Sequence, residues 1–462
     1  MESRLTESCY ETLRRDLKTP KAADSPPGPK AIMSLPLDSS GLCRNIIRYL
    51  STAATTALSR SLSCDITSGR FGSTISSAGF QRRALPALAC SVGVVAWSGH
   101  VLTIPLALLL LVLLSTAMTR KVALTTCVAY YAGATWQIVP GAATFFGHHA
   151  NPVQVLSLWA GASLLLATPW AILWSPRRAL RLWRMPLALV LLAIPPLGVI
   201  GCASPLVAAG LLFPGTAWFG LALTALVCGL LSSYPALGLA LALAFATPAH
   251  MFYRSQPAPP DWRAESTRFG GVGLDTPTPL ADYQAGQSIQ QIALRSDARV
   301  ILFPETVVTN WNPGTDLFWK PAIDTLREQG KTILVGANVF DPTSHHYLNS
   351  IVIRGAEQRP DFVQRIPIPI AMWIPLSKTG VPLQLRKPGT IKIAGQNAAI
   401  LICYEQLLVW PVVTSFVRHP TLLLGTANDY WAENTTIPDI QRACLESWAR
   451  LFRVPLLWAQ NT

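Results

Sequence analysis

The segment "ILICYEQLL", residues 400–408, places a cysteine directly after a run of apolar residues. The run is typical of a buried β-strand, and α/β sheets place their functional sites at the carboxyl ends of strands. Cys403 is therefore either a core thiol, the usual state of a free cysteine, or a nucleophile at a strand end. The segment alone favours the core thiol, so the rest of the chain has to decide.

Two other apolar runs also end in polar residues. "RVILFPET" (299–306) ends at Glu305, and "TLLLGTANDYW" (421–431) ends at Asn428 and Asp429. A carboxylate that meets a thiol in a dry pocket can act as its base, whereas burial alone raises the pKa of a thiol and makes it inert. We therefore expect Glu305 to lie beside Cys403, although each residue alone could simply cap a strand.

The remaining runs predict the fold of this part of the chain. Besides 299–305, 397–405 and 421–428, strands are predicted at 332–340, 348–355 and 389–395, and helices at 279–296 and 438–452. Apolar strands mixed with helices indicate an α/β sandwich whose sheets are buried on both faces.

The upstream half has a different composition. Only 13% of the chain is charged, against about 25% in a typical soluble protein, and Ala84 to His250 contains no Asp or Glu. This indicates a membrane domain at 84–250, after a polar, flexible tail at 1–83 and before a Pro-rich linker at 251–265 and the α/β domain at 266–462. About seven transmembrane helices are predicted, at 85–98, 101–118, 122–139, 153–174, 185–202 and twice within 205–248.

Basic residues between these apolar runs explain much of the net charge of +13. Arg82/Arg83, Arg120/Lys121 and four arginines within 177–184 are expected on the cytoplasmic side, so no direct nucleic-acid contact is predicted. Seven spans would place the C-terminal domain on the opposite side. The nine cysteines show no metal-binding spacing, and neither a metal nor a cofactor is expected.

The ordered set "FPET", "ILVGANV", "ILICYE" and "TANDYW" resembles the nitrilase (carbon–nitrogen hydrolase) superfamily, whose fold is an α-β-β-α sandwich with a Glu-Lys-Cys triad. A multi-span half joined to such a domain looks like apolipoprotein N-acyltransferase. The resemblance covers roughly residues 84–462. It implies that Glu305 is the general base and that Cys403 forms a thioester with an acyl group. It also implies a pocket lined by Tyr404, Glu405, Asn428, Asp429 and Trp431.

The triad lysine is the point of departure. The acyltransferase segment that carries it corresponds to "FVQRIPIPIAMWIP", 362–375, which places Gln364 at the lysine and Ala371-Met372 at a Gly-Glu pair. Arg365 is the nearest cation. Its guanidinium stays charged, so it could stabilise an oxyanion but hardly transfer a proton. Family-type catalysis therefore depends on which of these two side chains lies between Glu305 and Cys403.

The segments "QRIPIPIAMWIP", "ANDYW" and "LLWAQNT" resemble a subgroup of plasmid conjugal transfer proteins with an acyltransferase-like architecture. This implies a multi-pass protein of the bacterial inner membrane with a periplasmic α/β domain. The expected partners are the bilayer, the transfer machinery and an acyl-lipid or lipoprotein substrate. Three functions stay open: acyl transfer or amide hydrolysis through Cys403, a non-catalytic scaffold, and a full apolipoprotein N-acyltransferase.

Overall fold

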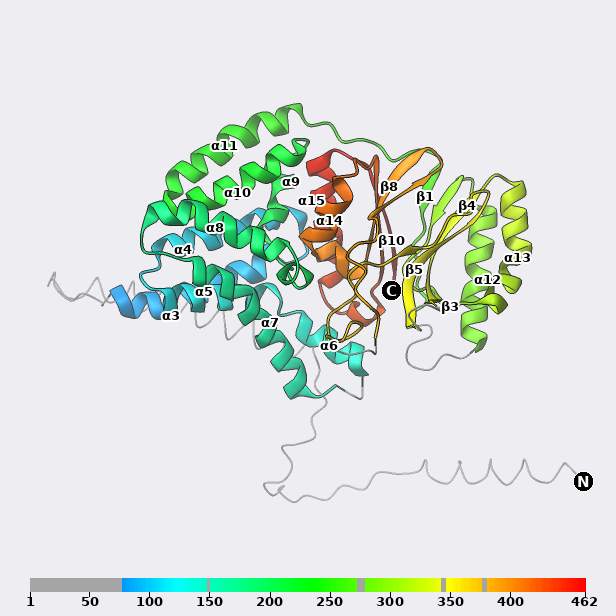
Figure 1. Ribbon diagram of the computed structural model, residues 1–462, viewed down its shortest axis with the longest axis horizontal. Coiled ribbons are helices and arrows are strands. Elements are labelled where there is room, and N and C mark those ends of the chain that lie inside the picture. The colour runs from blue at the N-terminus through cyan, green and yellow to red at the C-terminus, as the bar shows by residue number, and fades with distance from the viewer. Residues whose placement is uncertain (1–76, 148–149, 272–278, 342–345, 376–379) are drawn as a thin grey trace, which may run out of the picture. The chain divides into compact units, whose positions relative to one another are not determined.

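The structure is a computed structural model that describes residues 77–147, 150–271, 279–341, 346–375 and 380–462. Most of the predicted tail lies outside these residues. Among the described residues, helices predominate from Ser77 to Phe252, and strands with four further helices follow (Figure 1).

Each of the seven predicted apolar segments lies on a helix. The helical half contains α3 (Ser77–Ala96), η1 (Val101–Leu108) running into α4 (Leu109–Thr116), α5 (Arg120–Ala134), α6 (Ile138–Phe146), α7 (Pro152–Leu173), α8 (Arg178–Ala193), η3 (Leu197–Val199), η4 (Pro205–Ala208), α9 (Ala209–Leu212), α10 (Ala217–Ser233) and α11 (Pro235–Phe252). The predicted segment 185–202 is displaced, because α8 begins at Arg178 and ends just before Pro195 and Pro196, which cannot continue a helix.

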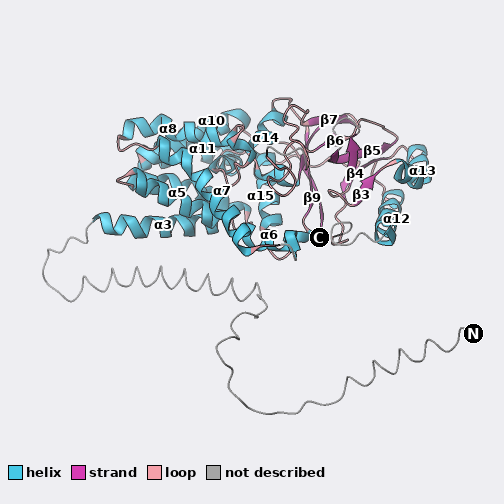
Figure 2. Ribbon diagram, turned by 60° about the horizontal axis from the view of Figure 1, so that its bottom comes forward, coloured by secondary structure: helices cyan, strands magenta, loops and turns pink. Residues whose placement is uncertain are grey.

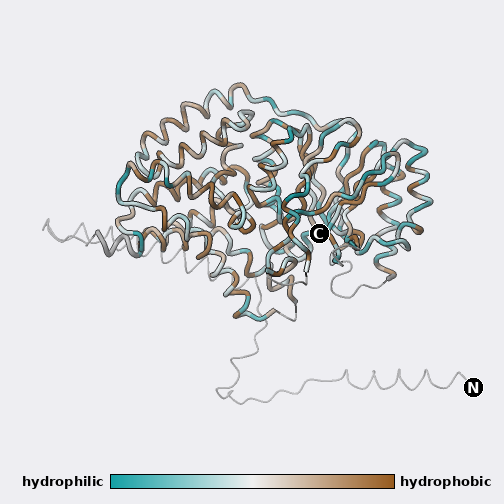
Figure 3. The backbone as a smooth tube through the Cα atoms, viewed as in Figure 1, coloured by the Kyte–Doolittle hydropathy of each residue, from teal (hydrophilic) through white to brown (hydrophobic). Residues whose placement is uncertain are grey.

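Within the described residues, two helices are long and apolar enough to cross a bilayer core, which takes about 20 residues. They are α7 and α11, and 11% of the most apolar window of α11 is buried inside the protein. Three shorter apolar helical stretches accompany them at Arg83–Ala96, Val101–Thr116 and Ala217–Ser233. Figure 3 shows hydrophobic residues along much of these helices. Seven membrane spans remain a prediction, since the structure supports two candidates.

The helices α3 and α5 touch at their backbones. A Cβ atom on Gly93 would overlap with the Tyr130 carbonyl oxygen, and one on Gly133 would overlap with that of Cys90. Gly93 therefore faces Tyr130, three residues before Gly133, and Gly133 faces Cys90, three residues before Gly93. Small residues that allow such close approach are typical of helix pairs in membranes.

Two sheets form the second half (Figure 2). Sheet A has the order β1-β2-β4-β5-β6, with β3 also paired to β4, and sheet B has the order β10-β9-β8-β7. The strands are β1 (Trp262–Ala264), β2 (Val300–Leu302), β3 (Val308–Trp311), β4 (Thr332–Asp341), β5 (His346–Gly355), β6 (Phe362–Val363), β7 (Thr390–Ile393), β8 (Gln396–Ile402), β9 (Leu422–Asn428) and β10 (Leu456–Asn461).

Alternate residues of the central strands enter different cores. Val300 and Leu302 of β2 pack between the two sheets, where they meet Ile400 and Ile402 of β8. Ile301 instead faces the helices α12 (Pro279–Arg295) and α13 (Pro313–Glu328). On sheet B, Leu401 and its neighbours face α14 (Val409–Phe416) and α15 (Ile437–Phe452). These layers confirm the predicted α-β-β-α sandwich.

Several elements were not predicted. They are β1, β3, β6, β10, α13 and α14, and β1 lies inside the segment 251–265 predicted as a linker. The four strands among them are short or mix polar with apolar residues, so their strand periodicity is weak. Tertiary pairing determines them instead; for example, β1 pairs in parallel with β2.

The helical half packs directly on the sandwich. A Cβ on Gly210 of α9 would overlap with the backbone of Ser447 on α15, and the Ser447 hydroxyl donates to the Val207 carbonyl. Gln137 donates to Thr436 at 2.9 Å. One continuous apolar core runs from the helices into sheet B.

Candidate functional site

Glu305 lies just after β2 and is almost fully buried, with 4% of its surface exposed. One carboxylate oxygen accepts from the side-chain amide of Asn349 on β5. The other accepts from the backbone N–H of Asn428, at the end of β9, at 2.9 Å. Strands of both sheets therefore position this carboxylate, as the strand-end pattern predicts.

Cys403 lies where β8 ends and η5 (Cys403–Leu407) begins. Its φ is +49°, in the left-handed region that non-glycine residues rarely adopt. The thiol is buried and lies close enough to Glu305 for the two groups to interact electrostatically. The sharp turn thus takes Cys403 out of the strand and aims its side chain at the predicted base.

Burial controls the protonation of this pair. It raises the pKa of Glu305 to about 7, partly offset by hydrogen bonds from Asn428, Cys403 and Asn349. Burial, together with the negative charges of Glu305 and Asp429, raises the pKa of Cys403 well above its usual value. The thiol therefore keeps its proton at neutral pH, whereas the carboxyl group of Glu305 titrates close to neutral pH.

Gln364 occupies the position beside this pair. It follows β6 and is fully buried, and its Nε2 donates to the Ile402 carbonyl at 3.1 Å. Its Oε1 accepts at 3.1 Å from Asn349, whose same Nδ2 also donates to Glu305. A ladder of neutral amides thus connects the base to the residue before the nucleophile.

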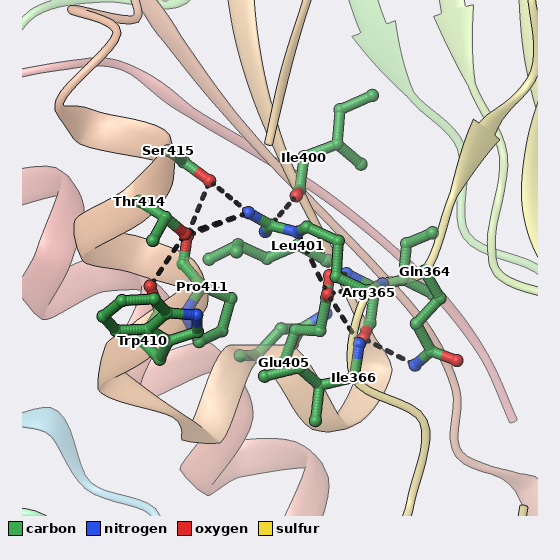
Figure 4. Close-up of polar contacts among 12 residues, drawn as sticks. Gln364, Arg365, Ile366, Ile400, Leu401, Glu405, Trp410, Pro411, Thr414 and Ser415 are labelled. Atoms are coloured by element: carbon green, nitrogen blue, oxygen red, sulfur yellow. Dashed lines mark hydrogen bonds and ion pairs between the residues drawn. The ribbon is translucent and has the colours of Figure 1, made fainter. Parts of the chain in front are cut away.

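Arg365 turns the other way (Figure 4). Its guanidinium Nη1 donates to the Pro411 carbonyl at 3.2 Å and to the Ser415 hydroxyl at 3.0 Å on α14. Consecutive residues of an extended chain point to opposite faces, so only one of Gln364 and Arg365 can face the sheet–sheet interior. Arg365 therefore does not supply the missing cation.

Glu405 holds Arg365 in that place. This fully buried carboxylate accepts from the backbone N–H and the Nε of Arg365, at 2.8 and 3.2 Å. It also accepts from the backbone N–H groups of Ile366 and Ile402. Glu405, predicted to line the pocket, instead ties the turn after β6 to the turn that carries Cys403.

The Asn428-Asp429 pair closes the other side of the site. The side chain of Asn428 donates to Thr306 at 3.0 Å and accepts from Asn461 at 2.8 Å. Asp429 is fully buried, and burial together with the charge of Glu305 raises its pKa well above the usual range. Glu305 and Asp429 therefore do not readily carry negative charges at the same time.

Gln441 of α15 connects Asp429 to the thiol. With its amide nitrogen toward Asp429, it donates to Oδ1 at 3.0 Å, and the other amide atom lies 3.9 Å from the Cys403 sulfur. Neither Gln441 nor Asn349 was predicted. A polar residue inside the apolar run "LNSIVI" was the only signal for Asn349.

Tyr404 and Trp431 contact the helical half. The Tyr404 hydroxyl donates to the carbonyl of Val199, the last residue of η3, at 3.0 Å. The Trp431 ring lies edge-on to Phe145 of α6 and against Gly141. These two predicted pocket residues therefore connect the site region to the helices.

Chemically, the site combines a protonated thiol, a carboxyl group with a pKa near neutrality and a second buried acid, linked by neutral amides. Among the described residues, no group of His, Cys, Asp or Glu is arranged to hold a metal ion. The proton of the thiol can pass to Glu305, but Gln364 is neutral and the Arg365 guanidinium is bonded to Glu405.

Sequence relatives identify the family. The chain is 33% identical over 394 residues to "Conjugal transfer protein TraB" of Agrobacterium fabrum (strain C58 / ATCC 33970), covering 81% of this chain and 91% of that protein. It is also 33% identical over 392 residues to "Probable conjugal transfer protein TraB" of Sinorhizobium fredii (strain NBRC 101917 / NGR234), covering 83% and 98%. The chain belongs to the TraB family of conjugal transfer proteins. This confirms the predicted resemblance to that group.

Solved structures show weaker likeness to the TraB-family chain, and no protein-family model matches it. An amidase from Nesterenkonia sp. is 14% identical with a TM-score of 0.31, over 43% of this chain and 74% of the amidase. A glutamine-dependent NAD+ synthetase from Acinetobacter baumannii is 18% identical with a TM-score of 0.22, over 36% and 31%. These scores are low, and the family assignment rests on the TraB sequences.

Proposed function

We propose that this TraB-family protein acts in conjugal transfer as a membrane-anchored scaffold whose α-β-β-α domain no longer performs nitrilase-type hydrolysis. The observation that carries the proposal is the place of Gln364. Its neutral amide lies where the resemblance implies the triad lysine, and it donates to the Ile402 carbonyl.

Electrostatics supports this proposal. A thiolate or an oxyanion at Cys403 would form beside Glu305 and Asp429, and both acids already raise the pKa of the thiol. Positive charge or free donors at the developing oxyanion usually supply a large part of catalysis by such sites. Arg365 cannot provide it, because Glu405 and α14 hold its guanidinium on the other face.

One observation favours a second function, acyl transfer or amide hydrolysis through a thioester. The Cys403 thiol and the Glu305 carboxyl group interact inside the sandwich. In that reaction the sulfur attacks the acyl carbon while Glu305 takes the thiol proton and returns it to the leaving group. An amine or water then cleaves the thioester. Full apolipoprotein N-acyltransferase activity is the third alternative. It ranks last because this chain lacks the lysine and a glutamate that the resemblance implies for that family.

Plasmid transfer separates the two main functions. A scaffold predicts that Cys403→Ser and Cys403→Ala strains transfer the plasmid at the wild-type frequency, with normal amounts of protein. A loss of about a hundredfold or more with a normally folded Cys403→Ser protein would instead establish the thioester mechanism. An alkylating probe adds an independent measurement: the scaffold predicts that Cys403 reacts no faster than the buried Cys444.

The proposed membrane anchor consists of α7, α11 and the apolar helices beside them. Exposed apolar side chains cover α11, including Leu237, Leu243 and Phe252, at 56%, 58% and 79% exposure. We propose a multi-pass inner-membrane protein with its sandwich in the periplasm. Alkaline phosphatase fused after Thr462 should then be active and green fluorescent protein dark, and the reverse pattern would place the sandwich in the cytoplasm.

A further inference from the structure

Two helix–helix turns bring basic residues together at one end of the helical half. Arg120 begins α5, and its Nε donates to the Trp174 carbonyl at 3.3 Å, at the end of α7. Arg181, in the first turn of α8, donates to the Leu114 and Ser115 carbonyls at the end of α4. We call Arg120, Lys121, Arg177, Arg178 and Arg181 the basic end.

The basic end is unfavourable by itself. Its residues lie at the N-termini of α5 and α8, where the helix dipole is already positive. Neither helix has an acidic residue in its first turn, and Arg177, which precedes α8, makes no side-chain capping hydrogen bond. Positive side chains and two positive helix ends therefore point to a missing anion.

The protein does not provide that anion within its described residues. Residues 84–250 contain no Asp or Glu, and none of the ion pairs between described residues includes a member of the basic end. Arg181 is 3% exposed, and its Nε is buried without a hydrogen-bond partner. Arg120, Lys121, Arg177 and Arg178 are exposed.

Apolar surface continues from the basic end along the helices. Ile172 at the end of α7 is 63% exposed, and Val190 on α8 is 47% exposed. Trp183, half exposed, lies beside the Arg184 guanidinium, 5.2 Å from its ring. An amphipathic aromatic ring between arginines and apolar surface is typical of the level of lipid headgroups.

We propose that the basic end binds the phosphate of an anionic phospholipid, whose acyl chains cover the adjacent surface of α7 and α8. The inference rests on the proposed membrane location. The lipid must also carry a net negative charge, because a zwitterionic lipid would leave the positive charge of the basic end uncompensated. Each basic side chain near a membrane surface contributes roughly a fivefold preference for acidic lipid.

The test uses the full chain, extracted from membranes and exchanged into equal amounts of phosphatidylglycerol and phosphatidylcholine, with retained lipids counted by native mass spectrometry. We expect the wild type to retain phosphatidylglycerol preferentially. Arg177→Gln/Arg178→Gln should lower that ratio by about tenfold or more, and Arg177→Lys/Arg178→Lys should keep most of it.

Arg254→Gln/Arg418→Gln is the matched control, since both arginines are exposed and lie outside the basic end. Equal retention of the two lipids by the wild type would overturn the inference, as would an equal fall of the ratio in the control. Inorganic phosphate that displaces the lipid would show a free-anion site instead. A protein that is washed from membranes by carbonate would refute the membrane location itself, a result distinct from loss of lipid preference.

Discussion

The side-chain amide of Gln364 donates to the carbonyl of Ile402, the residue that precedes Cys403. The hydrogen bond fixes an uncharged group where the resemblance to nitrilases implies a lysine. No positive charge from this amide therefore stabilises a thiolate, and the Cys403 thiol keeps its proton.

Replacing Gln364 by lysine should make Cys403 more reactive. An ammonium group within about 4–6 Å of the thiol and Glu305 favours their charged forms and lowers both pKa values by about one to three units. We expect alkylation of Cys403 at pH 7.5 to accelerate by about tenfold or more, measured by mass spectrometry of the modified peptide. Gln364→Met is the control, and acceleration by methionine as well would mean that loosened packing is the cause.

The ion pair between Arg365 and Glu405 should be essential for folding. Both side chains are almost fully buried, so Glu405→Gln leaves an unpaired buried charge and should destabilise the protein by about 3–5 kcal/mol. Thermal unfolding in detergent measures this change. The exposed pair Arg442–Glu446 is the matched comparison, and Glu446→Gln should cost less than about 1 kcal/mol. Similar losses in both variants would contradict the structural role of Glu405.

Glu305 should make stability depend on pH. Its pKa is raised by burial to about 7 from 4.5, so the folded protein binds more protons than the unfolded chain between these values. Stability contributed by this group is therefore greatest at low pH and falls as the pH rises from about 4.5 to 7. Unfolding temperatures of wild type and Glu305→Gln between pH 4.5 and 8 should diverge in slope. Parallel curves would show that Glu305 is not the titrating group.

The contact between α3 and α5 should tolerate no side chain. Gly133→Ala would push a Cβ into the Cys90 carbonyl, whereas a Cβ on Gly161 of α7 meets nothing within 4 Å. We expect Gly133→Ala to lower the unfolding temperature markedly and Gly161→Ala to leave it unchanged or raise it, because alanine favours helix. Equal effects would mean that α3 and α5 do not pack closely in the folded protein.

Local patterns predicted the strand-end residues well, because an apolar run and the polar residue after it are neighbours in sequence. Glu305, Cys403 and Asn428 meet as expected. The same patterns could not decide between Gln364 and Arg365, since the face each occupies depends on the pairing of the two-residue strand β6 with β5. Asn349 and Gln441 come from segments 54 and 38 residues from Cys403, and only the folded sheets bring them to the site.

Cys403 and Tyr404 are adjacent, yet they belong to different environments. The thiol faces Glu305 inside the sandwich, while the tyrosine hydroxyl is fastened to Val199, 205 residues earlier in the chain. One peptide bond therefore joins the interior of the sandwich to the helices. A displacement of those helices would therefore also move the turn that carries the sulfur.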